Sequence, residues 1–247
     1  MQPRKDRSLT EIQRGFDEML YFVDAYQGKG PLNCLIVGLG HERVYLDDPD
    51  IGRHLVGHGS YQPSIFAACC EGRGLDYNLT LLDKEYLPLY YARKMRKLVV
   101  LNVPALDPAM PMYAELTCRK LSYSFFKTDI KAKLPKSLRK KRKAGEITYI
   151  QHDISQSITF SNSPFDLIVC TNVLGYLHDP EKEKAALRTF RKNLSSKGVA
   201  IVSLHNIEVE DTGLADITEQ ILSKLRSSGK LHFGDAYHEY KLLTLRK

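Results

Sequence analysis

Several features that would place this sequence in a special class of protein are missing from it. None of its apolar runs approaches the roughly 18 residues needed to cross a bilayer. The first residues are charged and lack the apolar segment of a signal peptide. The five cysteines include no C-x-x-C pair, which argues against a zinc ribbon or a redox motif. We therefore expect no membrane association and an intracellular protein, located in the cytoplasm or the nucleus.

The composition is otherwise that of an ordinary globular protein. Of the 247 residues, 43% are hydrophobic and 26% are charged, which excludes general disorder and allows a sizeable core. This length suits one large α/β domain better than two full ones. We expect an N-terminal helix within residues 1–30 and a main domain over residues 31–247, with an insertion at about 98–145.

One stretch carries more positive charge than the net charge of the whole chain, which is +7. Residues 131–143 contain eight basic residues and no acidic one: Lys131, Lys133, Lys136, Arg139, Lys140, Lys141, Arg142 and Lys143. Three interpretations stay open: a solvated arm, a signal for nuclear localisation, and a patch that contacts the phosphates of RNA or another polyanion. The first two rank ahead of RNA contact because the neighbouring aromatic residues precede the basic stretch and do not alternate with it.

Short apolar runs alternate with amphipathic stretches along the chain. The apolar runs lie at residues 32–37, 79–82, 147–150, 165–170 and 199–204, and helices are predicted at 8–27, 64–72, 84–97, 180–194 and 211–227. The pattern predicts an α/β fold: a doubly wound, mostly parallel, seven-stranded Rossmann-like sheet. Residues 230–246 are expected to add an antiparallel C-terminal hairpin. Residues 41–63 are expected to form a long polar loop, which we interpret as a lid in preference to a metal site.

Polar or glycine residues follow each predicted strand directly. In chain order they are Gly38, Gly40, Asp83, Asp153, Thr171, Asn172 and His205. Because the carboxyl ends of parallel strands meet at one edge of a sheet, we expect these residues to form one ligand site.

The glycine turn does not fit a dinucleotide site. The pattern G-x-G-x-x-G would need a third glycine where this chain has Arg43, and an acidic residue about twenty positions later. S-adenosylmethionine has no phosphate and needs less from the protein. It needs close backbone approach at glycines, a carboxylate for the ribose hydroxyls and a polar group for the adenine amine. Asp83 and Asp153 match the last two requirements.

A family resemblance is carried by residues 165–177, Phe-Asp-Leu-Ile-Val-Cys-Thr-Asn-Val-Leu-Gly-Tyr-Leu. They resemble the fourth-strand motif of class I S-adenosylmethionine-dependent methyltransferases. They are similar in particular to the chemotaxis-receptor (protein-glutamate) methyltransferases, whose pattern is F-D-L-I-x-C-R-N-V-L-I-Y-F. Residues 194–199 and 59–65 resemble two further segments of that family. Thr171 replaces the arginine of its C-R-N pattern, which argues against receptor glutamates as the substrate.

The resemblance implies a methyltransferase domain over residues 31–247 with S-adenosylmethionine as cofactor. It implies that Gly38 and Gly40 contact the methionine end, Asp83 the ribose, Asp153 the adenine region and Asn172 the methionine amino or carboxylate group, with Thr171 next to it. For the methyl acceptor, His205 is the preferred general base, and Tyr176 either lines the substrate pocket or packs in the core. The acceptor itself stays open between protein, RNA and small molecule, and the alternative function is a non-catalytic, partner-binding scaffold.

Overall fold

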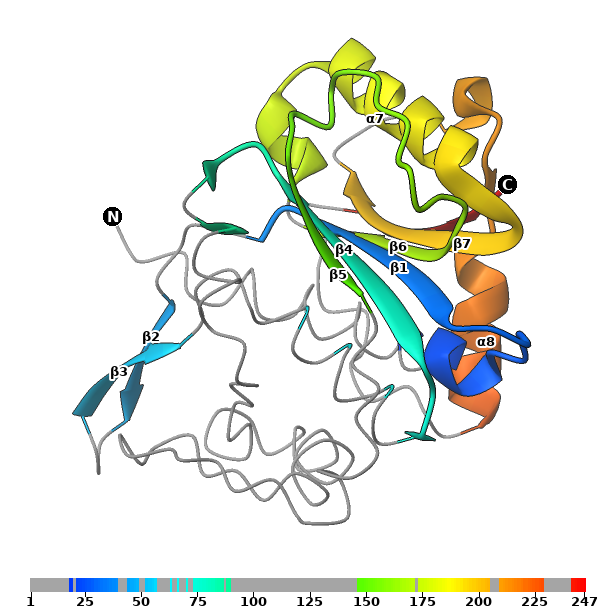
Figure 1. Ribbon diagram of the computed structural model, residues 1–247, viewed down its shortest axis with the longest axis horizontal. Helices are drawn as coiled ribbons and strands as arrows, with labels where there is room; N and C mark the ends of the chain where they lie inside the picture. Colours follow the sequence, from blue (N-terminus) through cyan, green and yellow to red (C-terminus); the bar gives the residue numbers. More distant parts are fainter. Residues whose placement is uncertain are drawn as a thin grey trace.

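A seven-stranded sheet forms the centre of the molecule in the computed structural model (Figure 1). The structure describes residues 18–19, 21–39, 44–48, 52–56, 63, 66, 70, 73–86, 88–89, 146–171, 173–204, 209–228 and 241–247. The strands lie in the order β5-β4-β1-β6-β7-β9-β8. Their bounds are β1 Leu32–Val37, β4 Tyr77–Asp83, β5 Ile147–Gln151, β6 Phe165–Cys170, β7 Leu194–Leu204, β8 Ala215–Asp216 and β9 Lys241–Arg246.

The direction of the strands confirms the predicted α/β class. Strands β5, β4, β1, β6 and β7 run parallel, while β9 runs antiparallel to both of its neighbours, β7 and β8. The chain leaves β1 for β4 and β5 on one side and then crosses back to β6 and β7 on the other. Strand order therefore reverses between β1 and β6, which is where ligands bind in doubly wound sheets.

Side chains of the central strands alternate between two hydrophobic clusters, one on each face of the sheet. In β1, Cys34 and Ile36 pack in the first cluster, and Leu35 and Val37 pack in the second. This alternation is the ordinary two-residue period of a strand, with both faces apolar because both are covered. The sheet is therefore the middle layer of three.

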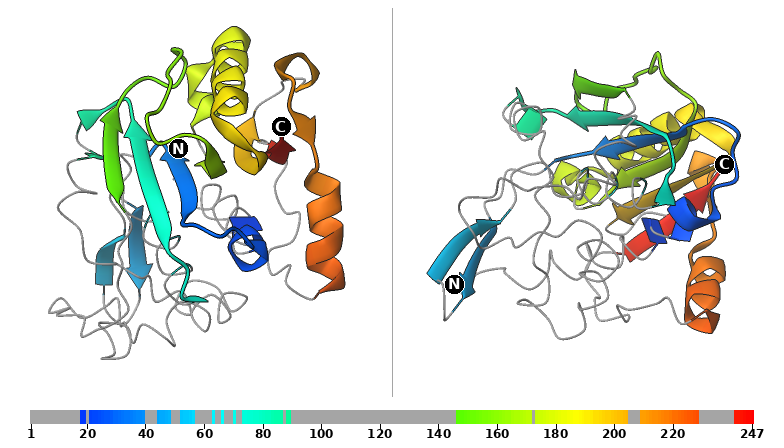
Figure 2. Two further views of the ribbon diagram at one scale, coloured as in Figure 1. Left: turned by 45° about the vertical axis from the view of Figure 1, so that its right-hand side comes forward. Right: turned by 60° about the horizontal axis from the view of Figure 1, so that its bottom comes forward.

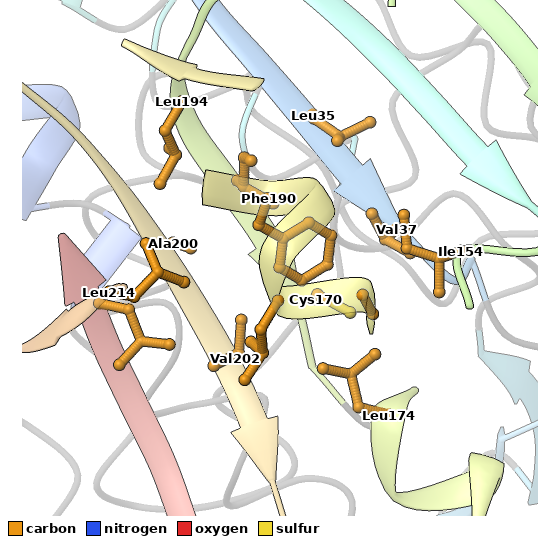
Figure 3. Packing of buried hydrophobic residues seen from close by; sticks show 14 of the residues in the cluster. Leu35, Val37, Ile154, Cys170, Leu174, Phe190, Leu194, Ala200, Val202 and Leu214 are labelled. Atoms are coloured by element: carbon orange, nitrogen blue, oxygen red, sulfur yellow. The ribbon is translucent and has the colours of Figure 1, made fainter. Parts of the chain in front are cut away.

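Helix α7, Pro180–Asn193, covers the second cluster. Asp179 begins the helix: its side chain accepts hydrogen bonds from the backbone N–H groups of Glu181 and Lys182. Pro180 at the first position needs no hydrogen-bond partner for its nitrogen, so the pair Asp-Pro is a strong start signal. Figure 3 shows the ring of Phe190 between side chains of β1, β6 and β7.

We predict that Phe190→Ala lowers the free energy of unfolding by about 3–5 kcal/mol, because it removes a fully buried ring and leaves a cavity. Denaturant unfolding followed by circular dichroism measures the change. Arg188→Ala, at an exposed position on the same helix, is the matched control. A loss below about 1 kcal/mol for Phe190→Ala, the size of an ordinary substitution, would contradict this packing.

The first cluster is covered by helical segments from distant parts of the chain. Met19 and Val23 come from an N-terminal helical segment, Phe66 and Cys70 from helical positions after β3, and Ile221 and Leu225 from α8, Thr218–Ser227. Helix α8 lies on the opposite side of the sheet from α7 (Figures 1 and 2). Among the described residues, no helix combines the length and the apolar character needed to cross a bilayer.

The prediction of one long loop over residues 41–63 is wrong. Strands β2, Val44–Asp48, and β3, Gly52–Val56, pair antiparallel and form a separate two-stranded sheet, which lies apart from the main sheet in Figures 1 and 2. Each strand mixes apolar with charged residues, so neither has the continuous apolar run of a buried strand. These strands are defined by their pairing with each other, so the hydrophobic pattern of the sequence does not predict them.

The predicted helix over 211–227 is also wrong in its first part. Residues Glu210–Thr212 form a 3-10 turn, η4, and β8 then pairs with β9 before α8 begins at Thr218. Gly213 adopts φ +71°, which ends the turn, and the Asp216 carboxylate accepts the Thr218 N–H at 2.9 Å. Strand β9 lies within the predicted C-terminal hairpin, while residues 229–240, where its other strand was expected, lie outside the described residues.

Candidate functional site

The turn after β1 brings the backbone against the loop after β6. Gly38 has φ +75°, a conformation that favours glycine, and its N–H donates to the Leu82 carbonyl at 2.8 Å. A Cβ atom at Gly38 would lie 2.0 Å from Cγ2 of Val173. Only a residue without a side chain fits here, because Val173 fills the space that a Cβ atom would need.

Asp83 ends β4 and joins two parts of the site. Asp83 as a whole residue is 7% exposed. One oxygen, Oδ2, accepts the Leu39 N–H of the glycine turn at 2.7 Å, and the other, Oδ1, accepts the Glu85 N–H at 2.9 Å. A carboxylate offers about four lone-pair directions, so these two bonds hold it in place and leave capacity for two ribose hydroxyls.

Asp153 lies just beyond the end of β5, the strand next to β4. Its Oδ1 accepts both the backbone N–H of Ser155, at 2.9 Å, and the Ser155 hydroxyl, at 2.8 Å. Burial alone would raise the pKa of Asp153, but the hydrogen bonds from Ser155 and the nearby Lys84 and His152 together hold that pKa below its ordinary value. The side chain is therefore an ionised, oriented acceptor at neutral pH.

Two further hydrogen bonds fasten the ends of β4 and β5 together. The His152 N–H donates to the Asp83 carbonyl at 3.0 Å, and the Gln151 side-chain amide donates to the Lys84 carbonyl at 3.3 Å. Asp83 and Asp153 are thus held at one edge of the sheet on adjacent strands, as the sequence pattern predicted.

The loop after β6 supplies the next part of this edge. Thr171 is 4% exposed, and the 3-10 turn η3, Leu174–Leu177, buries Leu174 and Gly175. Tyr176, in the same turn, is 60% exposed. The interpretation of Tyr176 as a core aromatic is therefore wrong, because η3 points its apolar residues inward and Tyr176 outward. A role for Tyr176 in the substrate pocket stays a prediction.

Three of the predicted site residues, Gly40, Asn172 and His205, lie outside the described residues, as does the stretch Lys131–Lys143. Their roles stay predictions, and so does the choice between a lid and a metal site for residues 41–63. Sequence reasoning missed Val173 and Ser155. The spacing Asp-x-Ser is a common turn pattern that could have indicated Ser155, whereas no local pattern indicates the contact of Val173 with Gly38.

Together, the described residues form a continuous edge along β5, β4, β1 and β6. With neighbouring strands about 4.8 Å apart, this edge is about 14 Å long, enough for an extended ligand. It offers the carboxylates of Asp153 and Asp83 at one end, the glycine turn at Gly38 in the middle and the loop with Thr171 at the other end. The residues present therefore fit S-adenosylmethionine.

Comparison with known proteins agrees with this assignment. The sequence profile of one family, described as a methyltransferase domain, matches residues 69–236, more than half of the chain. A search of the curated proteins gave no match.

Solved structures similar to this chain include a TehB-like SAM-dependent methyltransferase from Corynebacterium glutamicum, with 14% identity, a TM-score of 0.42 and coverage of 93% of this chain and 87% of that chain. The N-methyltransferase NodS from Bradyrhizobium japonicum matches with 16% identity, a TM-score of 0.43 and coverage of 98% of both chains. These identities and TM-scores are too low to transfer a substrate. The family match and the fit of the site to the cofactor carry the conclusion: the chain belongs to the methyltransferase-domain family and is an S-adenosylmethionine-dependent methyltransferase.

Proposed function

We propose that this enzyme binds its cofactor along the edge formed by β5, β4, β1 and β6 and methylates an acceptor on the β6–β7 side. The observation that carries the proposal is the hydrogen bond from Leu39 N–H to Asp83, which joins the glycine turn to the carboxylate after β4. The sheet topology supports it, because the strand order reverses at this edge.

In this arrangement each described residue has a specific task. Asp83 accepts hydrogen bonds from the ribose hydroxyls, and Asp153 accepts one from the adenine amine. Gly38 allows the backbone to approach the methionine end, with Gly40, Thr171 and Asn172 as its predicted neighbours. Bound S-adenosylmethionine supplies a methyl group already activated by its sulfonium, so the protein needs chiefly to align the acceptor and exclude water.

The acceptor side is proposed to involve Tyr176 and His205. Tyr176 is exposed in η3, which follows Thr171 in the loop after β6, and contacts the acceptor there. His205 follows β7, the strand next to β6, and would remove a proton from the acceptor where the acceptor needs to lose one. An acceptor with a free lone pair would need no such base.

Within the superfamily, we infer that residues 165–177 are related to the corresponding segment of chemotaxis-receptor methyltransferases. The agreement at Phe165, Asp166 and Cys170 supports this relationship. We do not propose receptor glutamates as the substrate, because Thr171 stands where that family has an arginine.

Calorimetry with S-adenosylhomocysteine, followed by a labelled methyl-transfer assay, tests the proposal. We expect saturable binding, and transfer of label to one of the protein, RNA or small-molecule fractions of a cell extract. The fraction that takes up the label identifies the class of acceptor. Absence of binding at millimolar ligand would overturn the proposed cofactor site. Binding without any transfer would favour a partner-binding scaffold.

For the basic stretch 131–143, we propose a location signal that directs the protein to the nucleus. The density of positive charge supports this role. Replacing Lys140, Lys141, Arg142 and Lys143 by glutamine should abolish nuclear accumulation of a fluorescent fusion. An unchanged distribution would contradict the proposal. If the same variant binds RNA more weakly at low salt and shows a shallower salt dependence, the stretch is a phosphate-contacting patch instead.

A further inference from the structure

The chain between β5 and β6 crosses one face of the sheet without forming a helix. Residues 152–164, all of which the structure describes, contain turns and no helix, although the crossover between two parallel strands is usually helical. Figure 1 shows this segment passing alongside α7. We call residues 152–164 the strap. Because the strap lacks regular secondary structure, its backbone N–H and C=O groups need partners elsewhere in the protein.

Asn193, the last residue of α7, supplies two of these partners from inside the protein. The residue is buried, and its Nδ2 donates to the Ile158 carbonyl at 3.2 Å while its Oδ1 accepts the Phe160 N–H at 3.4 Å. Nδ2 also donates to the carbonyl of Thr189, within α7, at 2.8 Å. One buried amide thus joins the strap to the C-terminal end of α7.

Further contacts hold the strap against the core. Ile154 and Phe160 are buried in the second cluster, and the ring of Phe160 packs edge-to-face on Phe165, with ring centroids 5.3 Å apart. Further along the strap, the Asn162 amide donates to the hydroxyl of Thr80, a buried residue of β4. The strap is therefore fixed to both α7 and the sheet.

The strap begins with the turn that carries Asp153. The Asp153 carbonyl accepts the Gln156 N–H at 3.0 Å, which closes a four-residue turn, and Ser155 holds the carboxylate within that turn. A single residue separates the turn from Ile158, where Asn193 holds the strap. Ser155 thus orients the carboxylate within the turn, while the place of the turn itself depends on what holds the strap.

We infer that Asn193 is a positioning residue for the cofactor: by holding the strap at Ile158 and Phe160, it keeps Asp153 where its carboxylate meets the adenine amine. Asn193 directly precedes the first residue of β7 and so lies at the edge of the sheet opposite the cofactor. It therefore acts through the strap and not by contact. The inference rests on the proposed function, since it assumes that Asp153 accepts a hydrogen bond from the adenine.

The test measures how strongly each variant prefers adenine to a base without the amine. The probes are S-adenosylhomocysteine and its 6-deamino analogue, in which a hydrogen atom replaces the adenine amine, and calorimetry gives the Kd of each. The ratio of the two Kd values is the readout, because a general loss of folded protein weakens both probes alike. The wild type should prefer S-adenosylhomocysteine about tenfold, the effect of one hydrogen bond to a charged group, and Asp153→Ala should lower this ratio to about 1.

Two variants of Asn193 and one control are compared. Asn193→Ala removes both bonds to the strap. Asn193→Ser removes them too, but a serine can still donate to the Thr189 carbonyl four residues earlier, so α7 keeps this bond even if the alanine variant fails to fold. Leu225→Ala is the matched control, because Leu225 is buried in the first cluster, on the other face of the sheet. This variant lowers the Tm without touching the strap.

For both Asn193 variants, we expect the ratio of Kd values to fall to about threefold or less, because the carboxylate of Asp153 no longer meets the amine. Leu225→Ala should keep the wild-type ratio. Hydrogen exchange over residues 152–160, measured relative to β6, should be faster in the Asn193 variants and unchanged in Leu225→Ala.

A wild-type ratio in the Asn193 variants would overturn the inference, whatever the hydrogen exchange, and would leave the proposed cofactor site intact. A ratio that also falls in Leu225→Ala would overturn it as well, because any loss of stability would then have the same effect. A wild-type protein that binds S-adenosylhomocysteine without preference would contradict the proposed role of Asp153. One that binds neither probe would contradict the proposed cofactor site, and the inference with it.

Discussion

Gly38→Ala is expected to destabilise the protein and abolish most of its cofactor binding. The substitution places a side chain where φ is +75°, which costs about 1–2 kcal/mol. It also places a Cβ atom 2.0 Å from Val173 Cγ2, and relieving such overpacking costs about 1–3 kcal/mol more. We therefore expect the free energy of unfolding to fall by about 2–5 kcal/mol. Denaturant unfolding and calorimetry with S-adenosylhomocysteine measure the two effects.

The double variant Gly38→Ala with Val173→Ala separates the two causes. Removing the methyl groups of Val173 leaves its Cβ at 3.3 Å from the new atom, a tight but tolerable contact. The double variant should therefore recover the part of the loss caused by the clash, while the strain at φ +75° persists. Val173→Ala alone serves as the reference. A Gly38→Ala variant with wild-type stability and affinity would show that the glycine turn does not have this geometry.

Asp83→Ala is the second change expected to have a large effect. It should weaken binding of S-adenosylhomocysteine by about 1.5–3 kcal/mol, because a charged acceptor of the ribose hydroxyls is lost. The variant should also be less stable, since the Leu39 and Glu85 N–H groups both lose their acceptor. Both hydrogen bonds are only partly buried, so water replaces part of what is lost and we expect a decrease in stability of about 1 kcal/mol. Calorimetry and thermal unfolding measure affinity and stability independently.

Two further variants make the Asp83 experiment specific. Asp83→Asn keeps the size of the side chain but has only one oxygen for two N–H donors, so it should lose both affinity and stability, though less than alanine. Asp76→Asn changes an exposed carboxylate just before the other end of the same strand and should alter neither. Unchanged affinity in Asp83→Ala would remove Asp83 from the cofactor site.

The parts of the fold that were predicted correctly have strong local patterns. Strands β1 and β6 begin and end where predicted, because each is a short run that is apolar and buried except at its second residue, Asn33 or Asp166. Helix α7 was predicted to within one residue at its C-terminal end, because Asp179 and Pro180 begin it and a regular apolar stripe continues it.

The elements that were missed depend on contacts with other segments. Strand β7 begins at Leu194, five residues earlier than predicted, because Leu194 pairs with Phe165 across a register shift. Gly198 permits this, since a Cβ atom there would lie 2.6 Å from the Phe165 carbonyl. Strand β8 has only two residues and exists through its pairing with β9. No local window of sequence contains these partners.

The candidate site likewise has features that the sequence predicts and features that depend on contacts between distant segments. The sequence by itself determined which residues follow which strand, and parallel strands necessarily place Gly38, Asp83 and Asp153 at one edge. Only the tertiary structure decided that Asp83 accepts the Leu39 N–H, that Gly38 fits against Val173 and that Tyr176 faces outward. The physical reason is that the position of each strand along the chain follows from local hydrophobic patterns, whereas each of these contacts is set by how segments far apart in the chain pack together.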